Sequence, residues 1–201
     1  MPVTTALPTP VVATHVPAGE IDSRTAYAGF GTAYVLGHGA SALSTGDSPL
    51  VALPGWLPMA LLGTGLAVGT AAATVASLRS QRGAGGPDAL AARLVGTAWL
   101  TGMAALFLAV TGLTGTHAAP ELQSVLWPAG SGLVVGLLYL GEGAVRRNVL
   151  HYGLGTWLAL TSTAALLLPA PGFFWVLALA GGGGFALAAV LEKRRLVATQ
   201  G

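Results

Sequence analysis

Six apolar stretches follow one another along this chain, separated by short segments that contain polar, Gly and Pro residues. Each stretch is close to the roughly 20 residues that an α-helix needs to cross about 30 Å of hydrocarbon. Because backbone polar groups cannot stay unpaired in lipid, continuous apolar runs of this length predict helices. The predicted spans cover residues 25–43, 53–78, 89–113, 125–145, 149–168 and 173–191.

A Gly-Thr pair recurs in the first, third and fifth spans at intervals of about 60 residues, and such a period indicates an internal repeat. The pairs are Gly31-Thr32, Gly96-Thr97 and Gly155-Thr156. A second Gly-rich apolar segment follows each pair about 30 residues later. The repeat predicts an all-α integral membrane protein with six transmembrane helices. They would form three hairpins, approximately residues 24–82, 88–147 and 148–195, around a central axis.

The remaining segments are expected to be tails of this single membrane domain, which covers residues 24–195. Residues 1–23 hold four prolines among Thr, Val and Ala, without a basic start or a long apolar core. We therefore expect a flexible tail there and not a cleaved signal peptide. Residues 196–201 are predicted to be a second, short tail.

Charge adds an orientation to this picture. Only 8% of the residues are charged and 53% are hydrophobic, which is too little charge to solvate a soluble protein. With six spans, all nine Lys and Arg residues fall on one side, and the opposite loops hold only Asp47, His117 and Glu121. The positive-inside rule predicts a multi-pass protein of the cell membrane with both termini in the cytoplasm. No soluble basic face is available for nucleic acid.

Several kinds of chemistry are not expected. The absence of cysteine excludes disulfides, thiol catalysis and thiolate metal sites. No two carboxylates lie with two histidines at ligand spacing, and no Ser, His and Asp arrangement stands out. The glycines at 181–184 lack the preceding strand and the following Lys of a phosphate-binding loop. We therefore predict neither an enzyme nor a metal or cofactor site.

The abundant glycines of the spans have two interpretations. Small residues let membrane helices approach closely, so they predict a tight helix seam. Backbone that lines a pore is the alternative. The glycines concerned are Gly63, Gly65, Gly69, Gly130, Gly132, Gly136 and those at 181–184.

The residue directly before each Gly-Thr pair is apolar, and the three such residues form a candidate pore constriction. They are Phe30, Val95 and Leu154, which occupy equivalent positions if one axis relates the hairpins. A dry ring of this kind gates by dewetting and favours small, neutral solutes. Ordinary bundle core is the alternative interpretation.

Polar residues beside this level are candidates for lining the path. Thr32, Thr97 and Thr156 could hydrogen-bond a solute, or could bond back to the carbonyl one turn earlier. Tyr34 and Trp99 follow two of the pairs closely and join them as pore-lining candidates.

Ionisable residues inside the spans are costly and therefore candidate functional groups. His38 lies about two turns beyond Thr32. It could relay a proton or be a neutral histidine with a hydrogen-bond partner. Glu142 and Arg146 are four residues apart, which predicts an ion pair on one helix, with His151 nearby.

Several motifs resemble the acetate/succinate transporter family, whose bacterial members are succinate/acetate permeases. Residues 55–110, which include the run Gly-Thr-Ala-Trp-Leu-Thr at 96–101, resemble that family's second and third helices. The Gly-Phe-Gly at 29–31, the Asn-Val-Leu-His at 148–151 and residues 183–192 resemble parts of its first, fifth and last helices. The family's Asn-Pro-Ala-Pro-Leu-Gly signature is absent, because residues 21–26 read Ile-Asp-Ser-Arg-Thr-Ala.

The resemblance implies three hairpins around a central path, assembled as a homohexamer, with Phe30, Val95 and Leu154 at the family's hydrophobic constriction. We therefore predict a channel or proton-coupled transporter for a small solute such as acetate or another short monocarboxylate. The urea/amide channel family is similar in architecture, which makes a urea or amide channel the first alternative. A non-transporting membrane subunit or scaffold of a larger complex is the second.

Overall fold

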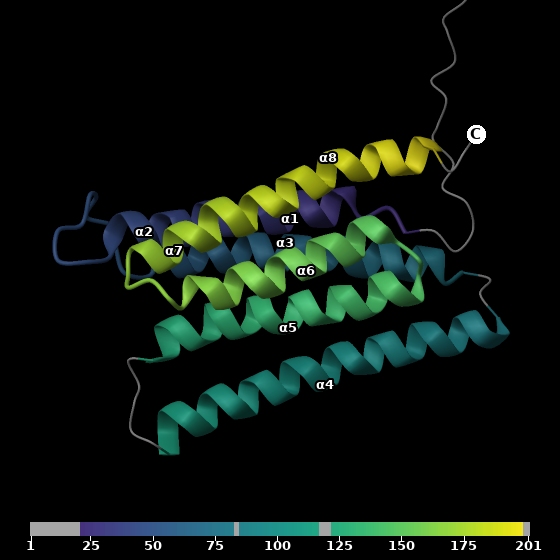
Figure 1. Cartoon of the computed structure of the whole chain (residues 1–201), viewed down its shortest axis with the longest axis horizontal. Helices are drawn as coiled ribbons and strands as arrows, with labels where there is room; N and C mark the ends of the chain where they lie inside the picture. The colour runs from purple at the N-terminus through teal and green to yellow at the C-terminus, as the bar shows by residue number, and fades with distance from the viewer. Residues whose placement is uncertain (1–20, 83–84, 117–121, 199–201) are drawn as a thin grey trace, which may run out of the picture.

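The computed structural model describes residues 21–82, 85–116 and 122–198, and these residues form six helical rods without a strand (Figure 1). Two of the rods are compound. The first rod consists of α1 (Arg24–Ala33), a π-helical turn η1 (Tyr34–His38) and α2 (Gly39–Ser44). The last rod consists of α7 (Gly172–Val176), the π-helical turn η3 (Leu177–Gly181) and α8 (Gly182–Ala198). The others are α3 (Leu57–Ser80), α4 (Gly86–Thr116), α5 (Gln123–Val145) and α6 (Val149–Ala165).

Four of the rods are long and apolar enough to cross a membrane: α3, α4, α5 and the last rod. The chain is therefore an all-α membrane protein, as its sequence predicts. The first rod and α6 coincide with predicted spans but fall outside this group of four. Six spans arranged as three hairpins around one axis stay a prediction. The N-terminal tail lies outside the described residues up to position 20.

The rods contact one another in the order α4, α5, α6, last rod, first rod and α3. Figure 1 shows α4 at one edge of the bundle beside α5. Helices α3 and α4 are the least buried of the four long apolar rods. The bundle interior is consequently built by the other four rods.

The two ends of the bundle differ in charge. The first rod, α4 and α6 begin at the end where α3, α5 and the last rod finish (Figure 1). All nine Lys and Arg residues lie within about two turns of these helix ends, and we call this the basic end. The residues are Arg24, Arg79, Arg82, Arg93, Arg146, Arg147, Lys193, Arg194 and Arg195.

The turn between α5 and α6 is short, and two consecutive residues, Arg147 and Asn148, end one helix and start the next. Arg147 has a φ of 53°, the left-handed conformation that commonly ends a helix. Asn148 then caps α6, since its side chain accepts a hydrogen bond from the His151 amide at 3.0 Å. The two helices therefore leave the turn side by side.

Glycines form close seams at several of the predicted positions. A Cβ on Gly136 would lie 2.5 Å from the Ala159 nitrogen, and one on Gly65 would lie 2.6 Å from the Ala33 Cβ. Neither approach leaves room for a side chain, so α5 packs closely on α6 and α3 on the first rod. Gly63 and Gly183 differ, because a Cβ there would meet nothing within 4 Å.

Candidate functional site

A first group of buried polar residues lies at the basic end, around Glu142 of α5. One carboxylate oxygen accepts a hydrogen bond from Arg146 Nε at 2.9 Å, which confirms the predicted ion pair on this helix. The other accepts a hydrogen bond from Trp99 Nε1 of α4 at 3.3 Å. The carboxylate therefore joins α4 to α5.

The same carboxylate faces His151 at the start of α6. His151 Nε2 lies 3.7 Å from Glu142 Oε2, which is an ion-pair distance but too long for a hydrogen bond. His151 Nδ1 and the Tyr27 hydroxyl share a hydrogen bond of 2.5 Å, and the imidazole centre lies 4.1 Å from the ring centre of Tyr139. We call Tyr27, Trp99, Tyr139, Glu142 and His151 the end cluster; it joins α1, α4, α5 and α6.

A second carboxylate at the basic end ties the last rod to the residues before α1. Glu192 is fully buried and pairs with Arg195 at 2.7 Å. It also accepts a hydrogen bond from the Ser23 amide at 3.2 Å. Arg195 donates a hydrogen bond to the Ile21 carbonyl at 3.1 Å. Both members of the ion pair therefore bind the backbone just before the first rod.

Asp22, which precedes the first rod, forms an ion pair of its own with Arg24. The Arg24 guanidinium donates to the Asp22 carboxylate at 2.6 and 2.9 Å. These hydrogen bonds hold the pKa of Asp22 below its usual value of 3.8, against the opposing effect of partial burial.

A second polar group lies two to three turns farther along the first rod, in the bundle interior. The rings of Tyr34 and His38 meet edge to face with centres 4.9 Å apart, and His38 is only 3% exposed. Ser162 of α6 is buried, and its hydroxyl has no hydrogen-bond partner among the described residues. A Cβ on Gly132 would overlap Ser162 Oγ and lie 3.5 Å from the Tyr34 hydroxyl, so both hydroxyls border this glycine. We call Tyr34, His38 and Ser162 the middle cluster.

An apolar layer separates the two polar groups. Leu154 and Leu158 of α6 and Phe185 of α8 are buried in one hydrophobic cluster, and Phe30 packs against it. The ring centres of Phe30 and Phe185 are 5.6 Å apart. Phe30 follows Tyr27 and precedes Tyr34 by about one turn each, and Leu154 lies between His151 and Ser162 on α6.

The structure thus brings two of the three predicted constriction residues into one layer. Phe30 and Leu154 share it, whereas Val95 lies on the outer helix α4, one turn closer to the helix start than Trp99. Trp99 itself packs on the cluster, with its ring centre 5.7 Å from that of Tyr139. The constriction therefore stays a prediction, and from α4 it is Trp99 that packs on the cluster that contains Leu154.

The three predicted threonines all bond to their own helices. Each hydroxyl donates to the carbonyl four residues earlier: Thr32 to Ala28 at 2.9 Å, Thr97 to Arg93 at 2.9 Å and Thr156 to Tyr152 at 3.1 Å. These hydrogen bonds match the second interpretation of the threonines, in which each hydroxyl bonds to the carbonyl one turn earlier and not to a solute. Thr32 and Thr97 are exposed on the outside of the chain, so a role of either in lining a path needs another copy or a changed arrangement.

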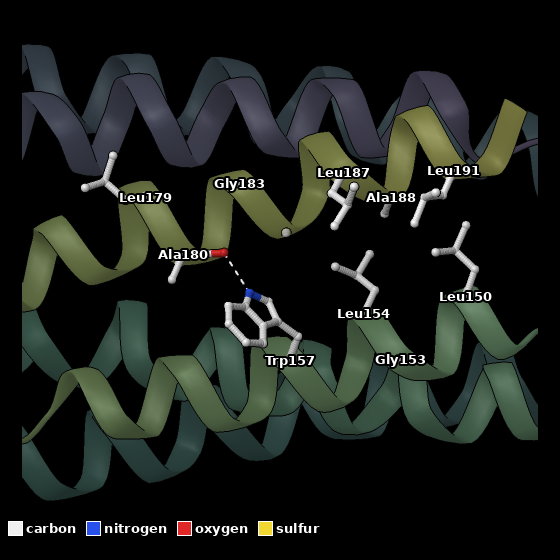
Figure 2. Close-up of a pocket in the computed structure, with 11 residues that line it drawn as sticks. Leu150, Gly153, Leu154, Trp157, Leu179, Ala180, Gly183, Leu187, Ala188 and Leu191 are labelled. Atoms are coloured by element: carbon white, nitrogen blue, oxygen red, sulfur yellow. Dashed lines mark hydrogen bonds between the residues drawn. The ribbon is translucent and has the colours of Figure 1, made fainter.

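An apolar groove of about 400 Å³ lies between α6 and the last rod (Figure 2). Leu154 lines it from α6, and Leu187 and Ala188 line it from α8. At one end the Trp157 indole crosses between the rods and donates a hydrogen bond of 2.7 Å to the Ala180 carbonyl. That carbonyl belongs to the π-helical turn η3, where the α-helical hydrogen-bond pattern is interrupted.

Sequence reasoning missed Tyr27, Tyr139 and Ser162. All three lie on predicted helices. Tyr27 and Tyr139 stand in apolar runs, where a buried tyrosine hydroxyl usually has a hydrogen-bond partner, so their positions could have indicated a polar contact. Ser162 carried no signal of its own among several Ser and Thr residues. No group of three or more His, Cys, Asp or Glu residues that could hold a metal occurs in the described part of the chain.

Comparisons of the chain with protein-family models, with curated proteins and with solved structures found no match. The resemblance to the acetate/succinate transporter family therefore rests on the sequence motifs alone, and membership of that family stays a prediction.

Proposed function

We propose that this protein is a channel or proton-coupled transporter of the cell membrane for a small solute such as acetate or another short monocarboxylate. In this proposal all six rods span the bilayer as three hairpins around a path, with both termini in the cytoplasm. A homohexamer is the assembly that the family resemblance implies.

The observation that supports a transport function is the alternation of polar and apolar levels inside the bundle. The end cluster and the middle cluster are polar groups buried in a membrane protein, where such groups are costly and are by default functional candidates. The apolar layer with Phe30 and Leu154 lies between them. A solute that moves from one polar group to the other must cross this layer, which acts as a hydrophobic gate.

The solute crosses the layer uncharged. The middle cluster holds hydroxyl groups and an imidazole, and none of the nine Lys and Arg residues lies at its level. An anion without a fixed cation nearby is costly in this interior. A carboxylate therefore crosses as the acid or together with a proton, whereas urea and small amides cross as they are.

The test is solute-induced swelling of proteoliposomes that contain the full chain, with acetate, urea, acetamide and a larger dicarboxylate as the solute panel. A pH-sensitive dye inside the vesicles shows whether protons accompany the solute. We expect flux of at least one small solute, changed severalfold in Phe30→Ala and in Leu154→Ala because both widen the apolar layer.

Matched controls exist at exposed positions of α6 and α4. Leu160→Ala removes a leucine that is exposed on α6, and Phe107→Ala removes an exposed phenylalanine of α4, and neither should alter flux. If Phe30→Ala and Leu154→Ala behave like these controls, the gate is wrong. If no solute passes and the protein purifies only with another chain, the non-transporting subunit is favoured instead.

A further inference from the structure

The groove between α6 and the last rod runs along the two helices from the Trp157 side toward the basic end. Its lining from the last rod extends from Leu179 in η3 to Leu191 in α8, which is about 18 Å of helix. Figure 2 shows Leu150 and Leu191 facing each other near one end, and Trp157 bonded to Ala180 near the other. The groove is therefore long, and a hydrogen bond crosses it near one end.

The lining of the groove is apolar and leaves open space. Gly153 of α6 and Gly183 of the last rod both line the groove, and a Cβ on either glycine would meet nothing within 4 Å. Leu179 and Leu187 are largely exposed at its rim. A volume of about 400 Å³ lies within the usual range of ligand pockets, so the space suits a flexible apolar chain.

Positive charge lies just beyond the basic end of the groove. Arg194 follows the last α8 lining residue, Leu191, by three positions, and Arg147 precedes the first α6 lining residue, Leu150, by three positions. Both arginines are exposed, and neither forms an ion pair within the described ranges. Three residues is nearly one helical turn, so Arg194 continues the face of α8 that lines the groove.

We propose that this groove binds an anionic phospholipid, with one acyl chain along α6 and α8 and the phosphate at Arg147 and Arg194. Basic residues where transmembrane helices meet the membrane surface attract anionic head groups, and arginine binds phosphate through two parallel hydrogen bonds. The apolar lining and the two arginines thus match the two parts of one molecule.

The charge pattern disfavours a second copy of the chain as the occupant. Copies in one membrane have the same orientation, so a symmetric contact across this groove would bring Arg147 and Arg194 close to the same residues of the other copy. Like charges at this distance repel, whereas a phosphate neutralises them.

The test measures lipid bound to the detergent-purified full chain by native mass spectrometry. The probes are phosphatidylglycerol and phosphatidylcholine with identical acyl chains. We expect the wild-type protein to retain phosphatidylglycerol preferentially. Gly183→Leu fills the groove and should lose this bound lipid. The double variant Arg147→Gln/Arg194→Gln should weaken phosphatidylglycerol binding about tenfold or more while leaving phosphatidylcholine unchanged.

Control variants separate this site from general lipid contact. Gly96→Leu places the same side chain on exposed α4, where a Cβ also meets nothing within 4 Å. Arg79→Gln/Arg82→Gln removes two exposed arginines, one in the last turn of α3 and one just after it. Equal lipid loss in the controls and the groove variants, or no loss in either, would overturn the proposal.

The second-copy alternative has a separate readout. The chain contains no cysteine, so Gly183→Cys introduces a single thiol into the groove. Disulfide-linked dimers of this variant in bilayers at low protein density would assign the groove to a second copy. If the Gly183→Cys protein stays monomeric, and added phosphatidylglycerol slows the reaction of its thiol with a maleimide, the lipid is supported.

Discussion

The end cluster and the middle cluster are both buried and polar, but they satisfy their polar atoms in different ways. In the end cluster, Glu142 accepts hydrogen bonds from two other side chains and Tyr27 shares one with His151 Nδ1, while His151 Nε2 has no hydrogen-bond partner among the described residues. In the middle cluster, the Ser162 hydroxyl has no hydrogen-bond partner within the described ranges, and Tyr34 and His38 contact aromatic rings. Bonded groups hold helices together, whereas an unbonded one can hydrogen-bond a solute at little cost to the fold.

The largest expected effect lies in the end cluster. Glu142→Ala leaves Arg146 and Trp99 without their shared acceptor and removes the carboxylate that faces His151, so it should lower the free energy of unfolding by about 2–3 kcal/mol. An SDS titration of the full chain, followed by circular dichroism, measures the loss. Asp47→Ala, which removes an exposed loop carboxylate, should change little. A similar loss in both variants would show that the end cluster does not hold the rods together.

A pair of hydroxyl deletions compares the two clusters directly. Tyr27→Phe removes a bonded hydroxyl and should cost about 1 kcal/mol, whereas Ser162→Ala removes an unbonded one and should be neutral or slightly stabilising. The same titration measures both. In the proteoliposome assay, Ser162→Ala should alter solute flux. A loss of more than about 1 kcal/mol in Ser162→Ala would mean that its hydroxyl is bonded after all.

The smallest effect is expected outside the membrane, at Asp22. Its pKa is lowered in the folded protein by the Arg24 guanidinium, so the pair stabilises the fold above the usual carboxyl pKa of 3.8. This contribution is lost as the pH falls through the lowered pKa of the folded state. Thermal unfolding measured between pH 7 and pH 3 should therefore be slightly less pH-dependent in Asp22→Asn. If Asp22→Asn and the wild-type protein show the same pH dependence, the Asp22–Arg24 ion pair is formed equally well in the folded and unfolded chains.

The positions of the helices followed from the sequence to within a few residues, because the apolar runs are continuous and end in clear breaks. The predicted span 149–168 ends earlier, at Ala165, since Leu166 to Leu168 form turns before Pro169. The last rod continues to Ala198, past the predicted 191. Its final residues include Leu, Lys and Arg, which favour helix, and water solvates the Lys and Arg side chains readily.

The arrangement of the candidate site was harder to predict from the sequence. Equivalent positions in the repeats suggested that Phe30, Val95 and Leu154 meet, but this requires α4 to lie as deep in the bundle as α6, and α4 lies at its edge. The link between Tyr27 and His151 joins residues 124 positions apart. No local pattern encodes such a pairing, because it depends on how α1 and α6 both pack against α8.

The paired π-helical turns have a mechanical consequence. η1 and η3 contact each other, with a Cβ on Gly181 placed only 2.7 Å from the Tyr34 ring. A π-helical turn interrupts the regular α-helical hydrogen-bond pattern, and helices bend at such interruptions. Because the two turns touch, we expect a bend in one rod at the level of Tyr34 and His38 to be accompanied by a bend in the other.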